Sequence, residues 1–144
     1  VIKINLWDTA GQEFYQAIVK NYYRDIVGAI FVFDLSNKET FEKIKHTWLE
    51  EFNKSNQNYI KNMLVGNKSD LVREVSYLEA KEFAEKNGMK YHEISSINEE
   101  IFHFFYSYIE DIYINQPRII EPGMGIRSPP PPQNIEYGKC CIII

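Results

Sequence analysis

Short apolar runs alternate with helix signals along the chain, and this alternation restricts the fold more than any other feature. Val1–Trp7 alternates apolar and polar residues, and Val27–Phe33 is a continuous apolar run rich in β-forming residues, so both predict strands. Shorter strands are predicted at Met63–Val65 and Lys90–Ile94. Because strands separated by helices form parallel sheets covered by helices on both faces, we predict an α/β fold.

Helices are predicted between and after these strands. Ser36–Glu39 and Ser76–Glu79 each match the Ser-x-x-Glu capping box, and apolar residues follow both at helical spacing. Gly88 can end the second of these helices. A last helix is predicted over Ile101–Ile112, and a weaker helical pattern covers Tyr15–Arg24.

The size and charge of the chain exclude some classes of protein. Its 144 residues suffice for one domain with a sizeable core. The net charge is −4 and no stretch is densely basic, so no nucleic-acid partner is expected. The longest apolar run is too short to span a bilayer, and no signal peptide is visible. The two cysteines are neighbours near the end of the chain, so nothing indicates a secreted, disulfide-built fold.

The composition changes at Gln116. Proline and glycine become frequent, with four prolines in the run Pro129–Pro132. We therefore predict a folded domain over residues 1–115 and a disordered or polyproline-like tail over 116–144. The sequence Ser128–Gln133 also fits a ligand of SH3- or WW-type domains, although a simple spacer has the same composition.

Three loops are expected at one edge of the predicted sheet. Ligands of parallel sheets bind beyond the carboxyl ends of the strands. The loops Asp8–Glu13, Asn67–Asp70 and Ser95–Asn98 follow three of these ends. They are therefore the candidates for a binding site.

The first loop has the chemistry of a phosphate sensor. The Asp8 carboxylate can hold a water of Mg²⁺, and the Gly11 backbone N–H can approach a phosphate oxygen. Gln12 can orient the water that attacks a terminal phosphate. An ordinary strand-to-helix turn with an Asp cap is the alternative interpretation of these residues.

The other two loops have groups that suit a guanine base. Asp70 can accept hydrogen bonds from guanine N1–H and its 2-amino group, while Lys68 can lay its methylenes across the base. Asn67 can support the loop and the base edge. The backbone N–H of Ser96 could reach guanine O6, and Ser95 could hold Asp70 in place. By themselves, such residues also occur in solvated surface turns.

Together these motifs resemble those of Rab-type small GTPases of the Ras superfamily. The matching segments are "WDTAGQE", "YYR", "VFD", "LVGNKSDL", "EISS" and the terminal "CC". The resemblance implies a P-loop-NTPase-like, Ras-type G domain that switches between GTP and GDP with Mg²⁺ in vesicle and protein transport. It also implies exchange factors, GTPase-activating proteins, effectors and prenylation or GDI-type chaperones as partners. A monomer is expected, on the cytoplasmic face of an endomembrane with a cytosolic pool.

The end of the chain resembles the lipidated tails of this family. Rab tails of the C-C-x-x-x kind carry a geranylgeranyl group on each cysteine, which here implies Cys140 and Cys141. Cys141–Ile144 also fits the C-a-a-X pattern for a single prenyl group. The sequence is therefore compatible with one prenyl group, with two prenyl groups, and with an unmodified apolar terminus.

Several features depart from the family pattern. Phe14 and Tyr15 stand where the family usually has Arg and Phe, and Ser96 and Ile97 where it has Ala and Lys. The phosphate loop G-x-x-x-x-G-K-[ST], the first switch and the N-terminal strands are absent, and the chain does not start with Met.

The absence of this N-terminal part from the sequence allows two interpretations of the chain. In the family fold, a strand from that front lies between the strands expected at Val1–Trp7 and Val27–Phe33, so the first of these would lose its neighbour. This chain would then be the C-terminal part of a complete GTP hydrolase, inactive by itself. The alternative is a membrane-tethered interaction module without a phosphate loop, which neither binds nor hydrolyses GTP.

Overall fold

The computed structural model describes residues 2–9, 26–55, 61–97, 100–115 and 135–143. Within these residues, five parallel strands form one sheet in the order β1-β5-β2-β3-β4. The strands are β1 (Ile2–Thr9), β2 (Ile26–Asp34), β3 (Lys61–Asn67), β4 (Lys90–Glu93) and β5 (Ile135–Ile143). The helices are α2 (Lys38–Lys43), the π-helix η2 (Ile44–Trp48), α3 (Leu49–Ser55), α4 (Tyr77–Lys86) and α5 (Glu100–Asn115).

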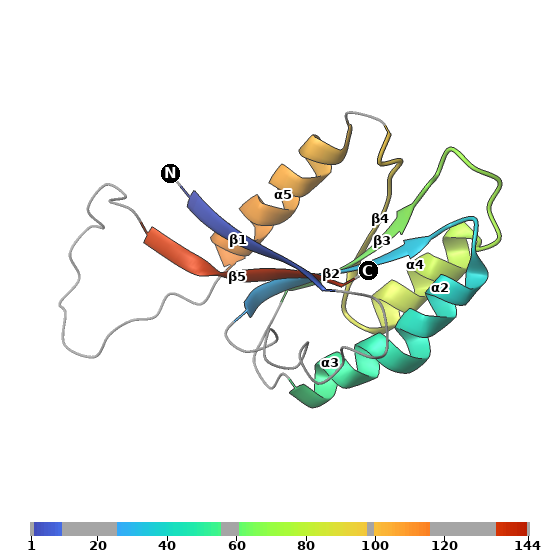
Figure 1. Ribbon diagram of the computed structural model, residues 1–144, viewed down its shortest axis with the longest axis horizontal. Helices are drawn as coiled ribbons and strands as arrows, with labels where there is room; N and C mark the ends of the chain where they lie inside the picture. The colour runs from blue at the N-terminus through green and yellow to red at the C-terminus, as the bar shows by residue number, and fades with distance from the viewer. Residues whose placement is uncertain (1, 10–25, 56–60, 98–99, 116–134, 144) are drawn as a thin grey trace.

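Helices cover both faces of the sheet, as Figure 1 shows, which confirms the predicted α/β class. The buried residues of β2 divide between the two faces because side chains alternate along a strand. Phe31 and Phe33 join the core formed with α2, η2, α3 and α4. Ile30 joins Tyr108 and Ile112 of α5 in a second core. None of the described helices is both long and apolar enough to cross a membrane.

Helix α5 approaches β2 closely at Gly28. The hydroxyl of Tyr108 donates to the carbonyl oxygens of Ala29 (3.2 Å) and Lys61 (2.7 Å). A Cβ atom at Gly28 would collide with that hydroxyl and lie 2.6 Å from Cδ1 of Ile112. Glycine at position 28 therefore allows the helix to rest directly on the strand.

The two predicted capping boxes have different outcomes. Ser76 accepts a hydrogen bond from the Glu79 backbone N–H at 3.1 Å and starts α4, as predicted. Ser36 does not cap α2, so that prediction is wrong. Its hydroxyl instead donates to Asp34 Oδ1 at 2.6 Å, and Asn37 caps the helix by accepting from the Glu39 N–H at 3.0 Å.

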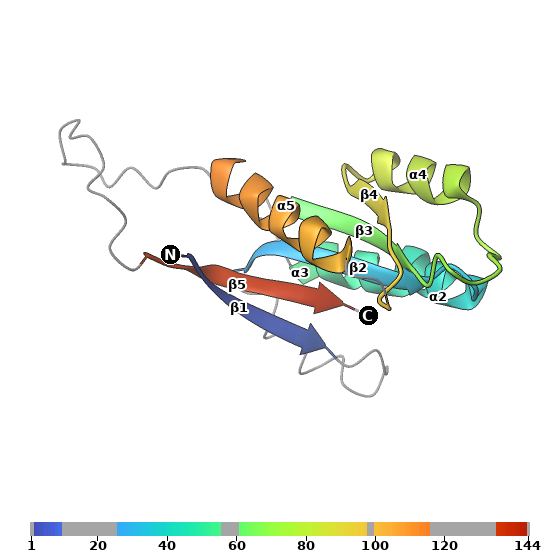
Figure 2. The same cartoon turned by 90° about the horizontal axis from the view of Figure 1, so that it is seen from above.

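The end of the chain differs from the disordered tail predicted for residues 116–144. Ile135–Ile143 forms β5, which lies between β1 and β2 and runs parallel to both (Figure 2). The expectation that the first strand would lack a neighbour is therefore wrong for this structure. β-branched isoleucines suit a strand, and β1 and β2 each offer an edge for pairing. The predicted proline-rich spacer and the weak helix at Tyr15–Arg24 lie outside the described residues.

Candidate functional site

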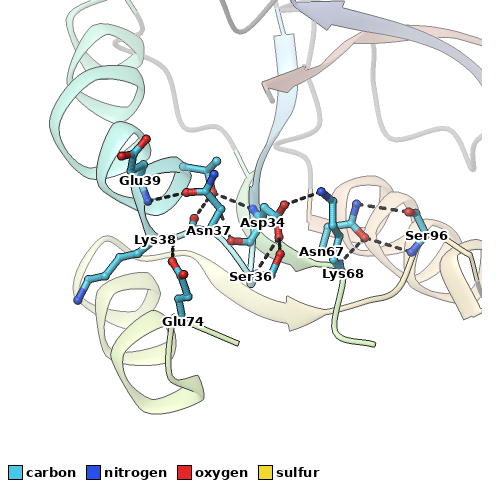
Figure 3. Close-up of polar contacts among 10 residues, drawn as sticks. Asp34, Ser36, Asn37, Lys38, Glu39, Asn67, Lys68, Glu74 and Ser96 are labelled. Atoms are coloured by element: carbon cyan, nitrogen blue, oxygen red, sulfur yellow. Dashed lines mark hydrogen bonds and ion pairs between the residues drawn. The ribbon is translucent and has the colours of Figure 1, made fainter. Parts of the chain in front are cut away.

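The loops after β2, β3 and β4 meet at the carboxyl edge of the sheet, and Asn67 is their common junction (Figure 3). Its Oδ1 atom accepts hydrogen bonds from the backbone N–H groups of Lys68 (2.8 Å) and Ser96 (3.1 Å). Its Nδ2 atom lies 3.5 Å from Ser96 Oγ. On the other side, its carbonyl oxygen accepts from Leu35 N at 2.9 Å. Asn67 thus supports the loop, as predicted.

Ser95 fixes the acidic residue of the β3 loop. Its hydroxyl donates to Oδ1 of Asp70 at 2.5 Å, and Ser95 is only 3% exposed. The Ser69 N–H also donates to the carbonyl oxygen of Ile94 at 3.1 Å. The predicted contact between Ser95 and Asp70 is therefore present. Asp70 itself is exposed, so its carboxylate is held in one orientation while remaining open to solvent.

Lys68 is held in an unusual position by Asp34. Its backbone has φ = 62°, in the left-handed region, and its Nζ atom lies 2.5 Å from Asp34 Oδ2. Ser36 donates to the other oxygen of the same carboxylate, from its N–H (2.8 Å) and its hydroxyl (2.6 Å). Burial acts to raise the pKa of Asp34, but these bonds from Lys68 and Ser36 outweigh it and leave the pKa below 3.8.

The role of Asp34 was missed from the sequence. Asp34 belongs to the matching segment "VFD", for which the sequence predicts no function, although it ends the central strand β2 at the same edge as the predicted loops. That position was the available signal. The ion pair with Asp34 directs the Lys68 ammonium to β2, while half of the lysine side chain remains exposed.

A second ion pair fixes the end of β4. Arg73 donates to both carboxylate oxygens of Glu93, at 3.1 and 2.8 Å, and the Tyr91 hydroxyl donates to one of them at 2.7 Å. Burial acts to raise the pKa of Glu93, yet the hydrogen bonds from Arg73 and Tyr91 leave it lowered. This network joins the long loop after β3 to β4, the strand that precedes Ser95.

The structure brings together five of the predicted site residues: Asn67, Lys68, Asp70, Ser95 and Ser96. The Ser96 N–H donates to Asn67 Oδ1, and its contact with guanine O6 stays a prediction.

The predicted phosphate sensor is described only in part. Asp8 lies at the carboxyl end of β1, so its backbone is placed but its side chain is not described. Gly11 and Gln12 lie outside the described residues. The described side chains include no group of three or more His, Cys, Asp or Glu that could hold a metal ion. Mg²⁺ bound mainly by phosphates and waters needs only one or two carboxylates, and the role of Asp8 in holding it stays a prediction.

Comparison with known proteins decides the family. A sequence model of the Ras family matches residues 1–114. The chain belongs to the Ras family. It is 50% identical over 99 residues to the Ras-related protein RABA4b of Arabidopsis thaliana, covering 67% of this chain and 44% of that protein. It is 44% identical over 100 residues to the Ras-related protein Rab-11B of Dictyostelium discoideum, covering 68% of this chain and 45% of that protein.

These relatives confirm the resemblance of this Ras-family chain to Rab-type small GTPases. The chain spans less than half the length of both relatives. The matched residues 1–114 cover β1 to β4, α2 to α4 and the β3 and β4 loops at the carboxyl edge, and they end one residue before the end of α5. Strand β5 lies beyond them.

Proposed function

We propose that this Ras-family chain carries the guanine-recognition part of a Rab-type GTP/GDP switch that acts in vesicle traffic. The observation that supports this best is the preset geometry of Asp70. Ser95 engages one lone pair of Oδ1, which leaves the other acceptor sites of the carboxylate to receive a base. The same loop is fixed on its other side by the bonds between Asn67 and Ser96.

Guanine suits this arrangement better than adenine. Guanine N1–H and its 2-amino group are both donors, and a carboxylate that is already oriented can accept from both. Adenine has neither donor on that edge, so it would desolvate Asp70 without compensation. The Lys68 ammonium is engaged by Asp34, and its methylene stem is free to cover one face of the base.

The residues near the end of β1 would act on the phosphates. Asp8 would hold a Mg²⁺ through water, and the metal would neutralise phosphate charge. The Gly11 N–H would donate to a terminal phosphate oxygen. Gln12 would orient the attacking water, the one catalytic role that we assign. These roles follow from the family motif "WDTAGQE".

Hydrolysis belongs to a protein that also has a phosphate-binding loop. The chain covers under half of its relatives' length and contains no G-x-x-x-x-G-K-[ST] sequence. We therefore propose that residues 1–144 alone bind GTP weakly and do not hydrolyse it. The alternative is a membrane-tethered interaction module. Such a module would lack guanine selectivity with or without an added phosphate-binding segment.

Membrane attachment and partners complete the proposal. Geranylgeranyl groups on Cys140 and Cys141 would anchor the protein to an endomembrane, because a single short lipid chain gives only marginal binding. Exchange factors, GTPase-activating proteins, effectors and GDI-type chaperones are the kinds of partner that the family implies.

The first test compares the chain with a longer version of itself. Fluorescent GDP is titrated into residues 1–144 and into the same residues preceded by the phosphate-binding segment of a Rab protein. We expect Mg²⁺-dependent binding only in the second case. Submicromolar binding by residues 1–144 alone would contradict the proposed fragment. An absence of selectivity for GDP over ADP in the longer protein would favour the interaction module.

A further inference from the structure

The carboxyl-terminal cysteines lie inside an internal strand of the sheet. In β5, Cys140 is the register partner of Leu6 in β1 and of Gly28 in β2. Cys141 is the partner of Trp7 and Ala29. The strand therefore has a neighbour on each side at both cysteine positions, as Figure 2 shows for the strand as a whole.

An internal strand uses its backbone groups on both sides. In parallel pairing, the N–H and C=O groups of alternate residues bond to opposite neighbours, so a strand with two partners leaves few of them free. Within the described sheet, β1 pairs with β5 alone. The attachment of β1 to the remaining strands thus depends on the occupant of the position between β1 and β2.

We propose that Ile135–Ile143 is an exchangeable strand, and that its insertion into the sheet and the lipidation of its cysteines exclude each other. This inference rests on the lipidation in the proposed function. A prenyltransferase must hold the terminus with its backbone unpaired. Transfer from geranylgeranyl diphosphate then forms a C–S bond, breaks the C–O bond to diphosphate, and releases the thiol proton to solvent. The inserted strand has to leave the sheet before this reaction.

The pairing of β5 has features that allow it to leave. Its register shifts against β1 between Lys3 and Asn5, and against β2 between Ile26 and Gly28. Such irregularities interrupt the hydrogen-bond ladder locally. Gly138 adds no side chain to the strand and weakens it further.

The Ras-type fold also implies a competitor for this position. In that fold, the place between β1 and β2 belongs to a strand that precedes β1 in the sequence. A longer form of the protein would contain both segments, and only one of them fits at a time. Insertion of the upstream strand would release the terminus with its two cysteines.

A disulfide cross-link tests whether the strand is inserted. Leu6→Cys with Cys141→Ser leaves one cysteine on each of two paired positions, 6 and 140. Neighbouring strands are about 4.8 Å apart, within the range that a disulfide spans. The control is Leu71→Cys with Cys141→Ser, because Leu71 (50%) and Leu6 (51%) are equally exposed. We expect clearly faster intramolecular cross-linking at position 6 than at position 71, because paired strand positions lie within the Cα distance that a disulfide spans. Equal rates would overturn the insertion.

The exclusion is tested with a variant that weakens the strand. Lys139 is paired with Asn5 and Ile26, so Lys139→Pro removes a backbone donor from the ladder. Lys139→Ala is the control for the lost charge. With geranylgeranyl diphosphate and a protein prenyltransferase, we expect several-fold faster lipid transfer to Lys139→Pro than to Lys139→Ala or the unchanged chain.

The outcomes separate this inference from the proposed function. Equal transfer rates in all three proteins would overturn the exclusion and leave the lipidation supported. Suppose that position 6 cross-links but no protein receives a lipid. This result would overturn both the lipidation and the exclusion, while the insertion of the strand would stay supported. Hydrogen exchange of residues 135–143 provides a readout without lipid. In the unchanged chain, the amides of residues 135–143 should exchange more slowly than they do in Lys139→Pro. The amides of β3 should be equally protected in both proteins.

Discussion

The hydroxyl of Ser95 donates to Asp70 Oδ1 at 2.5 Å, across 25 residues of sequence. The bond joins the loop after β4 to the loop after β3 and orients the carboxylate that we assign to guanine. A free Asp70 would have to lose rotamer freedom when the base binds, whereas this one is already placed.

Ser95→Ala should therefore weaken guanine-nucleotide binding. Ordering one free side chain on binding costs about 0.5–1.5 kcal/mol, so we expect a loss of roughly two- to tenfold in affinity. Titration with fluorescent GDP, in the protein that contains a phosphate-binding segment, measures it. Ser69→Ala is the matched control, because the exposed Ser69 bonds to Ile94 through its backbone N–H, and it should change affinity little. Equal losses in the two variants would contradict the role of Ser95.

Asp70→Asn should change which base is preferred. The amide of the new side chain presents an N–H donor where the carboxylate had only acceptors. Xanthine has a carbonyl at the position of the guanine 2-amino group, so the variant should lose affinity for GDP and gain it for xanthosine diphosphate. Competition between the two nucleotides measures the exchange. A variant that keeps its preference for GDP would show that position 70 does not contact the base edge.

The ion pair of Lys68 and Asp34 predicts a pH dependence. The pKa of Asp34 is lowered in the folded protein from 3.8, so its contribution to stability is present above pH 3.8. The contribution is lost as the pH falls through the lower, folded value. Asp34→Asn should make unfolding less dependent on pH in that acidic window. Denaturant unfolding of both proteins between pH 2 and 6 tests this, and parallel pH profiles would refute it.

Gly28→Ala should destabilise the fold through α5. The added methyl group overlaps the Tyr108 hydroxyl and Ile112, and overpacking typically costs about 1–3 kcal/mol. Thermal unfolding measures the loss. Gly88→Ala provides a contrast, because nothing lies within 4 Å of that site and only its φ of +67° is unfavourable for alanine. In the double variant Gly28→Ala/Tyr108→Phe, part of the loss should be recovered.

The sequence was sufficient for the parts of the site that depend on strand order. Asp70 and Ser95 each follow a predicted strand, and parallel strands place both loops at one edge, so their contact could be expected. The partner of Lys68 could not be expected from the sequence, because the left-handed backbone at that residue redirects the side chain toward Asp34. The start of α2 was missed for a related reason, since Ser36 satisfies the same carboxylate.

Strand β5 shows a different limit of sequence interpretation. Ile135–Ile143 follows a proline-rich segment and has no helical or alternating pattern strong enough to overrule a disordered tail. Its structure depends on the two strand edges with which it pairs, which are more than 100 residues away in the chain. Such nonlocal pairing leaves little trace in the local sequence.

Nucleotide competition measures the guanine selectivity that we assign to Asp70. Fluorescent GDP is bound to residues 1–144 joined behind the phosphate-binding segment of a Rab protein, and is then displaced with GTP or with ATP. Because Asp70 would remain unpaired opposite adenine, we expect that displacement by ATP needs a concentration roughly 10⁴-fold higher than displacement by GTP. Displacement by GTP and ATP at equal concentrations would contradict it.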